Sequence, residues 1–146
     1  MGGRSRRAPA PAAVIVVDTT VWIDFLEARG TAFDRHLTQL IERDAVLALV
    51  DIVYGEVLQG IRDDAAYERT RTSLLAYPIL RPRDLRTFET AANLYRAARR
   101  RGLTVRRSVE CLIAATCLET GAEIYHNDRD FDALAAVSNL RIHRPG

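Results

Sequence analysis

The chain of 146 residues contains no lysine, and all 21 of its basic residues are arginine. A P-loop requires the lysine of its GK[ST] motif, and Schiff-base catalysis requires a side-chain amine, so both chemistries are excluded. The sequence also lacks an apolar run approaching the roughly 20 residues of a membrane-spanning helix. We therefore expect no membrane segment. The net charge of +2 also shows that the protein as a whole is not a polycation.

Cysteine and histidine are scarce. Cys111 and Cys117 lie in one predicted helix, about 9 Å apart along its axis and on different faces, so they cannot form a disulfide with each other. Unpaired thiols are typical of a reducing compartment, and we expect a cytoplasmic protein. The three histidines are scattered and belong to no HExxH or CxxC motif, which argues against a zinc site.

The hydrophobic content of 48% and the charged content of 27% are ordinary for a globular protein, and the length suits one domain. The opening MGGRSRRAPAPAA is basic and then rich in proline and alanine, without the apolar core of a signal peptide. We expect residues 1–12 to be a disordered basic tail and residues 13–146 to form the single domain.

Short apolar strands alternate with amphipathic helices along this domain. The pattern predicts strands at 13–17, 46–50, 78–80, 123–125 and 140–142. Helices are predicted at 19–30, 32–43, 52–61, 63–77, 85–101, 108–120 and 131–137. Asp51 and Ser108 are the expected caps of the third and sixth helices, and Gly102 and Gly121 are expected to end the fifth and sixth. This alternation predicts an α/β fold with a central, mostly parallel sheet.

Acidic residues follow two of the predicted strands. Asp18 closes the strand 13–17, and Asp128 and Asp130 follow the strand 123–125 in HNDRDFD. Taken singly, Asp18 is typical of a helix cap. Asp128 and Asp130 are typical of an Asx-rich turn. In parallel sheets, however, functional groups gather at the carboxyl ends of strands.

Two further acids, Glu56 and Glu110, lie inside predicted helices beside their apolar stripes. The alternative to a functional role for Glu56 is a position at the rim of the core, paired with an arginine. The alternative for Glu110 is a helix-capping role. Taken together, however, the acids repel one another, and their pKa values rise unless a cation is present. Mg²⁺ or Mn²⁺ suits an all-carboxylate site, so the set predicts a divalent-cation centre.

Four segments together resemble PIN-domain ribonucleases, and most closely their VapC toxins from bacterial toxin–antitoxin pairs. In chain order they read VIVVDTTVW, IVYGEVLQG, TVRRSVECLIAA and HNDRDFDAL. The resemblance runs from about Val14 to the C-terminus. It implies a Rossmann-like α/β/α sandwich and metal-dependent endonucleolytic cleavage of RNA.

The resemblance also assigns roles by position. Asp18, Glu56, Glu110 and Asp128 match the family's four acids, with Asp130 accessory in the same loop, and Thr20 matches a hydroxyl residue that supports the site. The resemblance makes Asp18 and the third acid the usual direct metal ligands. We expect the metal ligands to be Asp18, Glu110, Asp128 and Asp130. Glu110 departs from the family, which normally has Asp there, and its extra methylene predicts weaker or altered metal preference.

RNA that approaches these acids requires basic side chains around them. Arg106 and Arg107 precede the helix of Glu110 and are the RNA-binding candidates. The run 99–101 either steers RNA or compensates the dipole of the preceding helix. Trp22 is expected in the core or at a dimer interface, with antitoxin docking as the alternative. The resemblance further implies a VapB-like antitoxin partner and a homodimer.

Three functions remain open from sequence. The first is a toxin endoribonuclease that uses Mg²⁺ or Mn²⁺ to activate water. The second is a PIN nuclease that processes RNA as a housekeeping enzyme. The third is a catalytically impaired domain, with Glu110 as its defect, that only binds an antitoxin. A receiver-like binding domain is excluded because it requires a lysine near its last strand.

Overall fold

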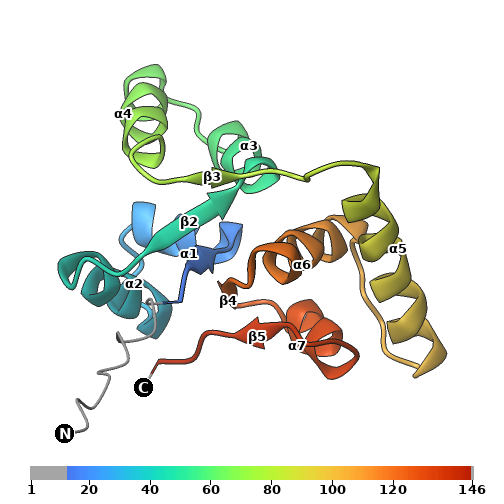
Figure 1. Cartoon of the computed structure of the whole chain (residues 1–146). Helices are drawn as coiled ribbons and strands as arrows, with labels where there is room; N and C mark the ends of the chain where they lie inside the picture. Colours follow the sequence, from blue (N-terminus) through green and yellow to red (C-terminus); the bar gives the residue numbers. More distant parts are fainter. Residues whose placement is uncertain (1–12, 146) are drawn as a thin grey trace, which may run out of the picture.

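The computed structural model describes residues 13–145; the tail predicted at 1–12 lies outside the described residues. Five parallel strands form one sheet in the order β3-β2-β1-β4-β5 (Figure 1). The strands are β1 (Ile15–Val17), β2 (Leu47–Val50), β3 (Ile79–Leu80), β4 (Glu123–Tyr125) and β5 (Arg141–Ile142). The predicted mostly parallel sheet is confirmed.

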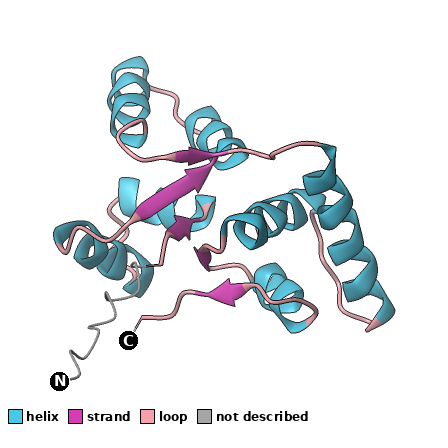
Figure 2. Ribbon diagram, in the orientation of Figure 1, coloured by secondary structure: helices cyan, strands magenta, loops and turns pink. Residues whose placement is uncertain are grey.

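Seven helices connect the strands (Figure 2). They are α1 (Thr19–Leu26), α2 (Ala32–Glu42), α3 (Asp51–Gln59), α4 (Asp64–Leu74), α5 (Leu85–Arg100), α6 (Ser108–Thr120) and α7 (Arg129–Ala136). Crossovers from β1 through β2 to β3 run in one direction along the sheet, and those from β3 to β4 and β5 run in the other. Right-handed connections therefore place α1 to α4 on one face and α5 to α7 on the opposite face.

Helix contacts agree with these two layers: α1 packs on α2 and α3, and α3 on α4, whereas α5, α6 and α7 pack on one another. The central strands β1 and β2 are buried along their whole length and consist of apolar residues, mostly β-branched. This is the composition expected of strands covered on both faces. The α/β/α sandwich implied by the resemblance is confirmed.

The strand order reverses between β1 and β4, because the chain leaves β1 toward β2 and returns on its other side at β4. In open parallel sheets, binding sites lie at the carboxyl ends of the strands at such a switch point. Asp18 directly follows β1, and the loop 126–128 directly follows β4. The topology therefore brings these two acid-bearing segments to one position.

The element ends differ modestly from the sequence prediction. Helix α7 starts at Arg129 rather than 131, because the Asp128 side chain accepts a hydrogen bond from the Asp130 N–H and caps it. Helix α1 ends at Leu26, short of the predicted 30. Ser108, expected to cap α6, is instead its first residue.

The ends of α5 and α6 were predicted correctly from glycine. Gly102 follows α5 with φ 70° and Gly121 caps α6 with φ 73°, a left-handed backbone that other residues rarely adopt. Cys111 and Cys117 are buried, unbridged thiols on α6. Every helix within residues 13–145 is too short or too polar to cross a membrane.

Candidate active site

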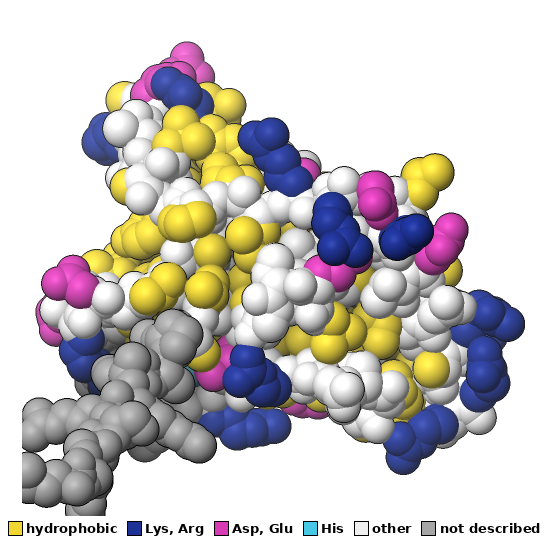
Figure 3. Space-filling model, in the orientation of Figure 1, with side chains coloured by type: hydrophobic (Ala, Val, Ile, Leu, Met, Phe, Trp, Pro, Cys, Tyr) yellow, Lys and Arg dark blue, Asp and Glu magenta, His cyan; other side chains and the backbone are white. Residues whose placement is uncertain are grey.

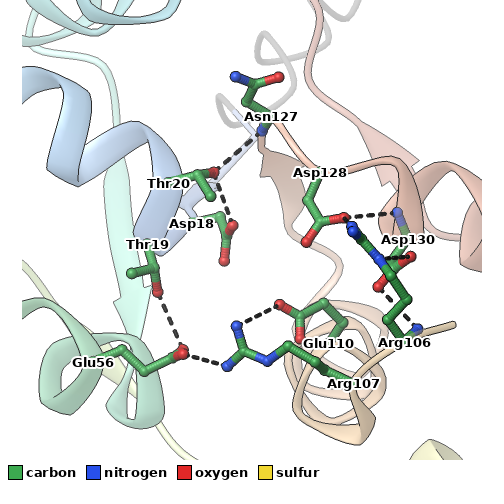
Figure 4. A network of polar contacts seen from close by, with 10 residues as sticks. All are labelled: Asp18, Thr19, Thr20, Glu56, Arg106, Arg107, Glu110, Asn127, Asp128 and Asp130. Atoms are coloured by element: carbon green, nitrogen blue, oxygen red, sulfur yellow. Dashed lines mark hydrogen bonds and ion pairs between the residues drawn. The ribbon is translucent and has the colours of Figure 1, made fainter. Parts of the chain in front are cut away.

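Asp18 lies where β1 passes into α1 and is 2% exposed. Its Oδ2 accepts a hydrogen bond from the Thr20 hydroxyl at 3.1 Å (Figure 4). The Thr20 Oγ1 in turn accepts one from the Asn127 N–H at 3.4 Å. Thr20 thus connects the first acid to the loop after β4.

The pKa of Asp18 is raised to about 6, chiefly because burial penalises the ionised carboxylate. Hydrogen bonds, including that from the Thr20 hydroxyl, lower it, and the negative charge of Glu56 raises it further. A carboxylate buried in this way gains more than an exposed one from a nearby cation.

Glu56 projects from α3 and meets two partners. The Thr19 hydroxyl donates to Oε1 at 3.2 Å, and the Arg107 guanidinium lies 2.5 Å from Oε2. The side chain is mostly buried, as its place beside the apolar stripe predicts. Thr19 is a site residue that sequence reasoning missed, because its partner is 37 residues away and only the fold brings them together.

Glu110 lies in the first turn of α6 and is 3% exposed. Its Oε2 has no hydrogen-bond partner among residues 13–145, whereas Oε1 lies 3.9 Å from the Arg107 guanidinium. Burial raises its pKa to about 7; the charge of Arg107 lowers it, and the charges of Asp18, Asp128 and Glu56 raise it. Glu110 is therefore a member of the acidic cluster, and no side-chain cap of α6 is formed.

Asp128 and Asp130 start α7 beside Arg106. The Arg106 guanidinium lies 3.2 Å from Asp128 Oδ1 and 3.5 Å from Asp130 Oδ1. Asp130 Oδ2 also accepts the Arg106 backbone N–H at 3.1 Å. Asp130 is almost fully buried, so in this arrangement it holds the loop between α5 and α6, while Asp128 faces the other acids.

The four acids Asp18, Glu56, Glu110 and Asp128 come from four segments and influence one another's charge. The structure thus brings together the acids singled out in the sequence. As arranged here, no three acid, imidazole or thiol groups of residues 13–145 are placed to surround one cation. Arginine guanidinium groups lie among the carboxylates instead (Figure 4).

The side chains present nevertheless fit a divalent cation. All candidate ligands are carboxylates, the donors that Mg²⁺ and Mn²⁺ prefer. Glu110 presents a buried oxygen without a partner among the described residues, and an unpaired buried polar atom is unfavourable unless a ligand satisfies it. Burial, and to a smaller extent the neighbouring acids, raises the pKa values of Asp18 and Glu110, and a bound cation would favour their ionised forms.

Other candidates from sequence have different surroundings. Trp22 is 2% exposed and packs with Phe25 and Tyr77 in the core, which confirms the first of its two interpretations. Arg101 donates from Nη1 to the Ala136 carbonyl at 2.6 Å and thereby ties the end of α5 to α7. It is thus one member of the run 99–101 with a structural contact.

Residues 15–137 match the family model described as the PIN domain. The chain is 36% identical over 129 residues to Ribonuclease VapC11 of Mycobacterium tuberculosis, a match that covers 88% of this chain and 96% of that protein. Equal identity and coverage are found for VapC ribonuclease Mb1587 of Mycobacterium bovis.

A solved structure shares the fold at low sequence identity. VapBC2 from Rickettsia felis, bound to a DNA fragment from its promoter, gives a TM-score of 0.69 at 15% identity. The match covers 89% of this chain and 97% of that one. At this identity the likeness concerns the fold alone.

Proposed function

Because the chain belongs to the VapC group of the PIN-domain family, we propose that it is an endoribonuclease that hydrolyses RNA with a bound Mg²⁺ or Mn²⁺. The observation that carries the proposal is the cluster of Asp18, Glu56, Glu110 and Asp128 at the switch point of the sheet, with an unpartnered oxygen on Glu110. Its relatives are named ribonucleases, and RNA is the substrate class that follows.

The four acids have distinct roles under this proposal. Asp18 and Glu110 would hold the principal cation together with Asp128, and Asp130 would support this set from the loop of Asp128. Glu56 orients the attacking water or joins a second ion. When bound, the cation supplies an activated water and neutralises charge at phosphorus.

The neighbouring residues position these groups. Thr20 holds the Asp18 carboxylate, and Thr19 holds that of Glu56. Arg106 and Arg107 are more than half exposed and neutralise the acids in the present arrangement. We propose that both arginines bind the RNA phosphates in the enzyme whose carboxylates would hold a cation.

The same family membership supports the role of toxin with a VapB-like antitoxin as partner, and the fold neighbour from Rickettsia felis is a VapBC complex. Residues 13–146 act as a single PIN domain in the cytoplasm, as a homodimer. The alternative is a catalytically impaired domain that only binds an antitoxin. This alternative depends on Glu110, since the family normally has Asp at this position.

The test is cleavage of total cellular RNA by purified protein in Mg²⁺ and in Mn²⁺, with Asp18→Asn and Glu110→Gln beside the wild type. We expect each substitution to lower the cleavage rate at least roughly 100-fold, because each removes a charged ligand. A Glu110→Asp variant with unimpaired cleavage shows that the site works with either acid. Cation binding by the wild type without cleavage contradicts the nuclease and supports the impaired domain.

Induced expression extends the test to the toxin role. Growth arrest by the wild type and none by Asp18→Asn is the expected result. Unchanged growth together with RNA cleavage in vitro contradicts the toxin role and supports the housekeeping one.

A further inference from the structure

A groove of about 700 Å³ runs between α5 and α6, outside the acidic cluster. Its lining includes Phe88, Tyr95, Arg96, Arg99, Arg106 and Leu112. Arg106 also contacts Asp128, so the groove borders the candidate active site at this residue. None of the described residues that line it is acidic. Figure 3 shows basic side chains gathered over the C-terminal end of α5.

Two aromatic rings in this groove are open to solvent: Phe88 is 50% exposed and Tyr95 is 38% exposed. The Arg99 guanidinium lies over the Tyr95 ring, 5.7 Å from its centre. Exposed aromatic rings next to arginines are the combination on which single-stranded nucleic acids stack their bases. Neither ring is part of the hydrophobic core, so folding alone does not explain their place.

We propose that this groove binds the single-stranded stretch of RNA that flanks the cleaved bond, with a base stacked on Tyr95 and Arg99 and a second base on Phe88. The proposal rests on the proposed ribonuclease function. It deepens that function because it names the part of the substrate that the enzyme holds and the side chains that hold it. Arg96 and Arg106 contact the backbone phosphates.

Charge decides between RNA and a second copy of the chain as occupant. A symmetric contact between two copies brings the same surface of each together. Both copies of Arg96, Arg99 and Arg106 would then lie in one interface, with no acidic side chain from the lining to neutralise them. A polyanion meets the same three arginines with opposite charge.

The first experiment measures binding of a fluorescein-labelled single-stranded RNA by anisotropy in Mg²⁺, with Asp18→Asn as the parent chain to prevent cleavage. Tyr95→Ala in this parent should weaken binding roughly tenfold or more, and Phe88→Ala by a similar factor, because each removes one stacking surface. Tyr95→Phe keeps the ring and should bind like the parent. Leu85→Ala, on the same helix but outside the groove and 78% exposed, is the matched control.

The second experiment identifies the stacked base without relying on any one variant. RNAs in which single positions lack the base are titrated against the parent. One position should weaken binding roughly tenfold, and the same loss should have no further effect on Tyr95→Ala. Arg96→Gln should reduce the dependence of log Kd on log salt by about 0.7, the value for one phosphate contact of a single strand.

The outcomes separate the two proposals. A parent and wild type that neither bind nor cleave RNA contradict the ribonuclease function itself. RNA binding that Tyr95→Ala and Phe88→Ala leave equal to Leu85→Ala contradicts the groove alone. If these variants instead halve the molecular mass in light scattering and leave the RNA Kd unchanged, the face joins two copies and the proposal is wrong.

Discussion

At the scale of single residues, the raised pKa of the buried Glu110 makes the stability of the protein depend on pH. In the folded chain its pKa is about 7, against 4.5 for an unburied glutamate, so folding favours its protonated form. This contribution to stability is complete below about pH 4.5 and is lost as pH rises through 7. Asp18, with a pKa of about 6, acts in the same direction at slightly lower pH.

We therefore predict that Glu110→Gln stabilises the cation-free protein at pH 8 relative to the wild type, by about 1 to 3 kcal/mol, and has little such effect at pH 4.5. Urea unfolding in EDTA at pH 4.5, 6 and 8 measures the difference. Glu68→Gln, an exposed acid on α4, is the control. If the difference in unfolding free energy between Glu110→Gln and the wild type shrinks from pH 4.5 to pH 8, the raised pKa of the buried Glu110 is contradicted.

Arg107 is the residue whose role changed most between sequence and structure. Its guanidinium joins Glu56 at 2.5 Å and Glu110 at 3.9 Å, and these charges raise its own pKa. Its position before α6 indicated only a basic residue near the site. The ion pair with Glu56 spans 51 residues and is visible only once α3 and α6 are placed.

We predict that Arg107→Gln gives Mn²⁺ a larger stabilising effect than in the wild type, because the cation no longer competes with a guanidinium for Glu56 and Glu110. The variant without cation should be less stable by about 1 kcal/mol, a modest loss because Arg107 is largely exposed. Thermal melting with and without Mn²⁺ measures both effects. Arg71→Gln, which breaks an exposed pair on α4, serves as control. Equal Mn²⁺ effects in Arg107→Gln and wild type would refute the competition.

At the scale of secondary-structure elements, two histidines join α2 to the segment that follows β5. The Nε2 atoms of His36 and His143 lie 2.9 Å apart, the rings stack, and His143 Nδ1 lies 3.0 Å from Glu123 on β4. Burial, the charge of His143 and that of Arg43 lower the pKa of His36. The folded state thus prefers neutral His36, and this preference weakens stability as pH falls below about 6.5.

We predict that His36→Gln makes the protein less sensitive to acid between pH 7.5 and pH 5. The variant loses the contact with His143 at pH 7.5, so it should start slightly less stable, and the difference should shrink or reverse by pH 5. Thermal melting across this range provides the measurement. Glu42→Gln, an exposed change at the end of α2, should follow the wild type. A constant gap between His36→Gln and wild type would show that the pair does not titrate.

Most elements were predictable from the sequence because their signals are local. The apolar runs of β1 and β2, the glycines after α5 and α6 and the polar residues before helices act within a few positions. The start of α7 was misjudged because HNDRD was interpreted as a loop, although Asp128 caps the helix from within it. The pairing of His36 with His143, 107 residues apart, has no local signal.

At the scale of the whole molecule, the sheet order determines the site. Alternating strands and helices predicted a parallel sheet, yet the order β3-β2-β1-β4-β5 follows from crossovers that reverse after β3, which no local pattern encodes. The acids were predicted as a group from their places after strands and beside apolar stripes. Their hydroxyl and guanidinium partners, Thr19 and Arg107, depend on the packing of α1, α3 and α6.

Because the acids come from segments between Asp18 and Asp128, a cation that binds them ties together both helical layers and the switch point of the sheet. Binding to the folded state alone stabilises it by about 2.7 kcal/mol at 100 times Kd. For a domain of this size, Mn²⁺ should therefore raise the melting temperature by roughly 5 to 15 °C, and excess EDTA should reverse the shift. The shift should be larger at pH 8 than at pH 5.5, since Asp18 and Glu110 must ionise to bind the cation.

Asp18→Asn should abolish the shift. Asp51→Asn is the matched control, because Asp51 directly follows β2 as Asp18 follows β1, yet its carboxylate accepts a hydrogen bond from the neighbouring Ile52 N–H. If Mn²⁺ stabilises Asp18→Asn as much as Asp51→Asn, the cation binds elsewhere. If Mn²⁺ does not stabilise the wild type or either variant, the four carboxylates do not form a cation site.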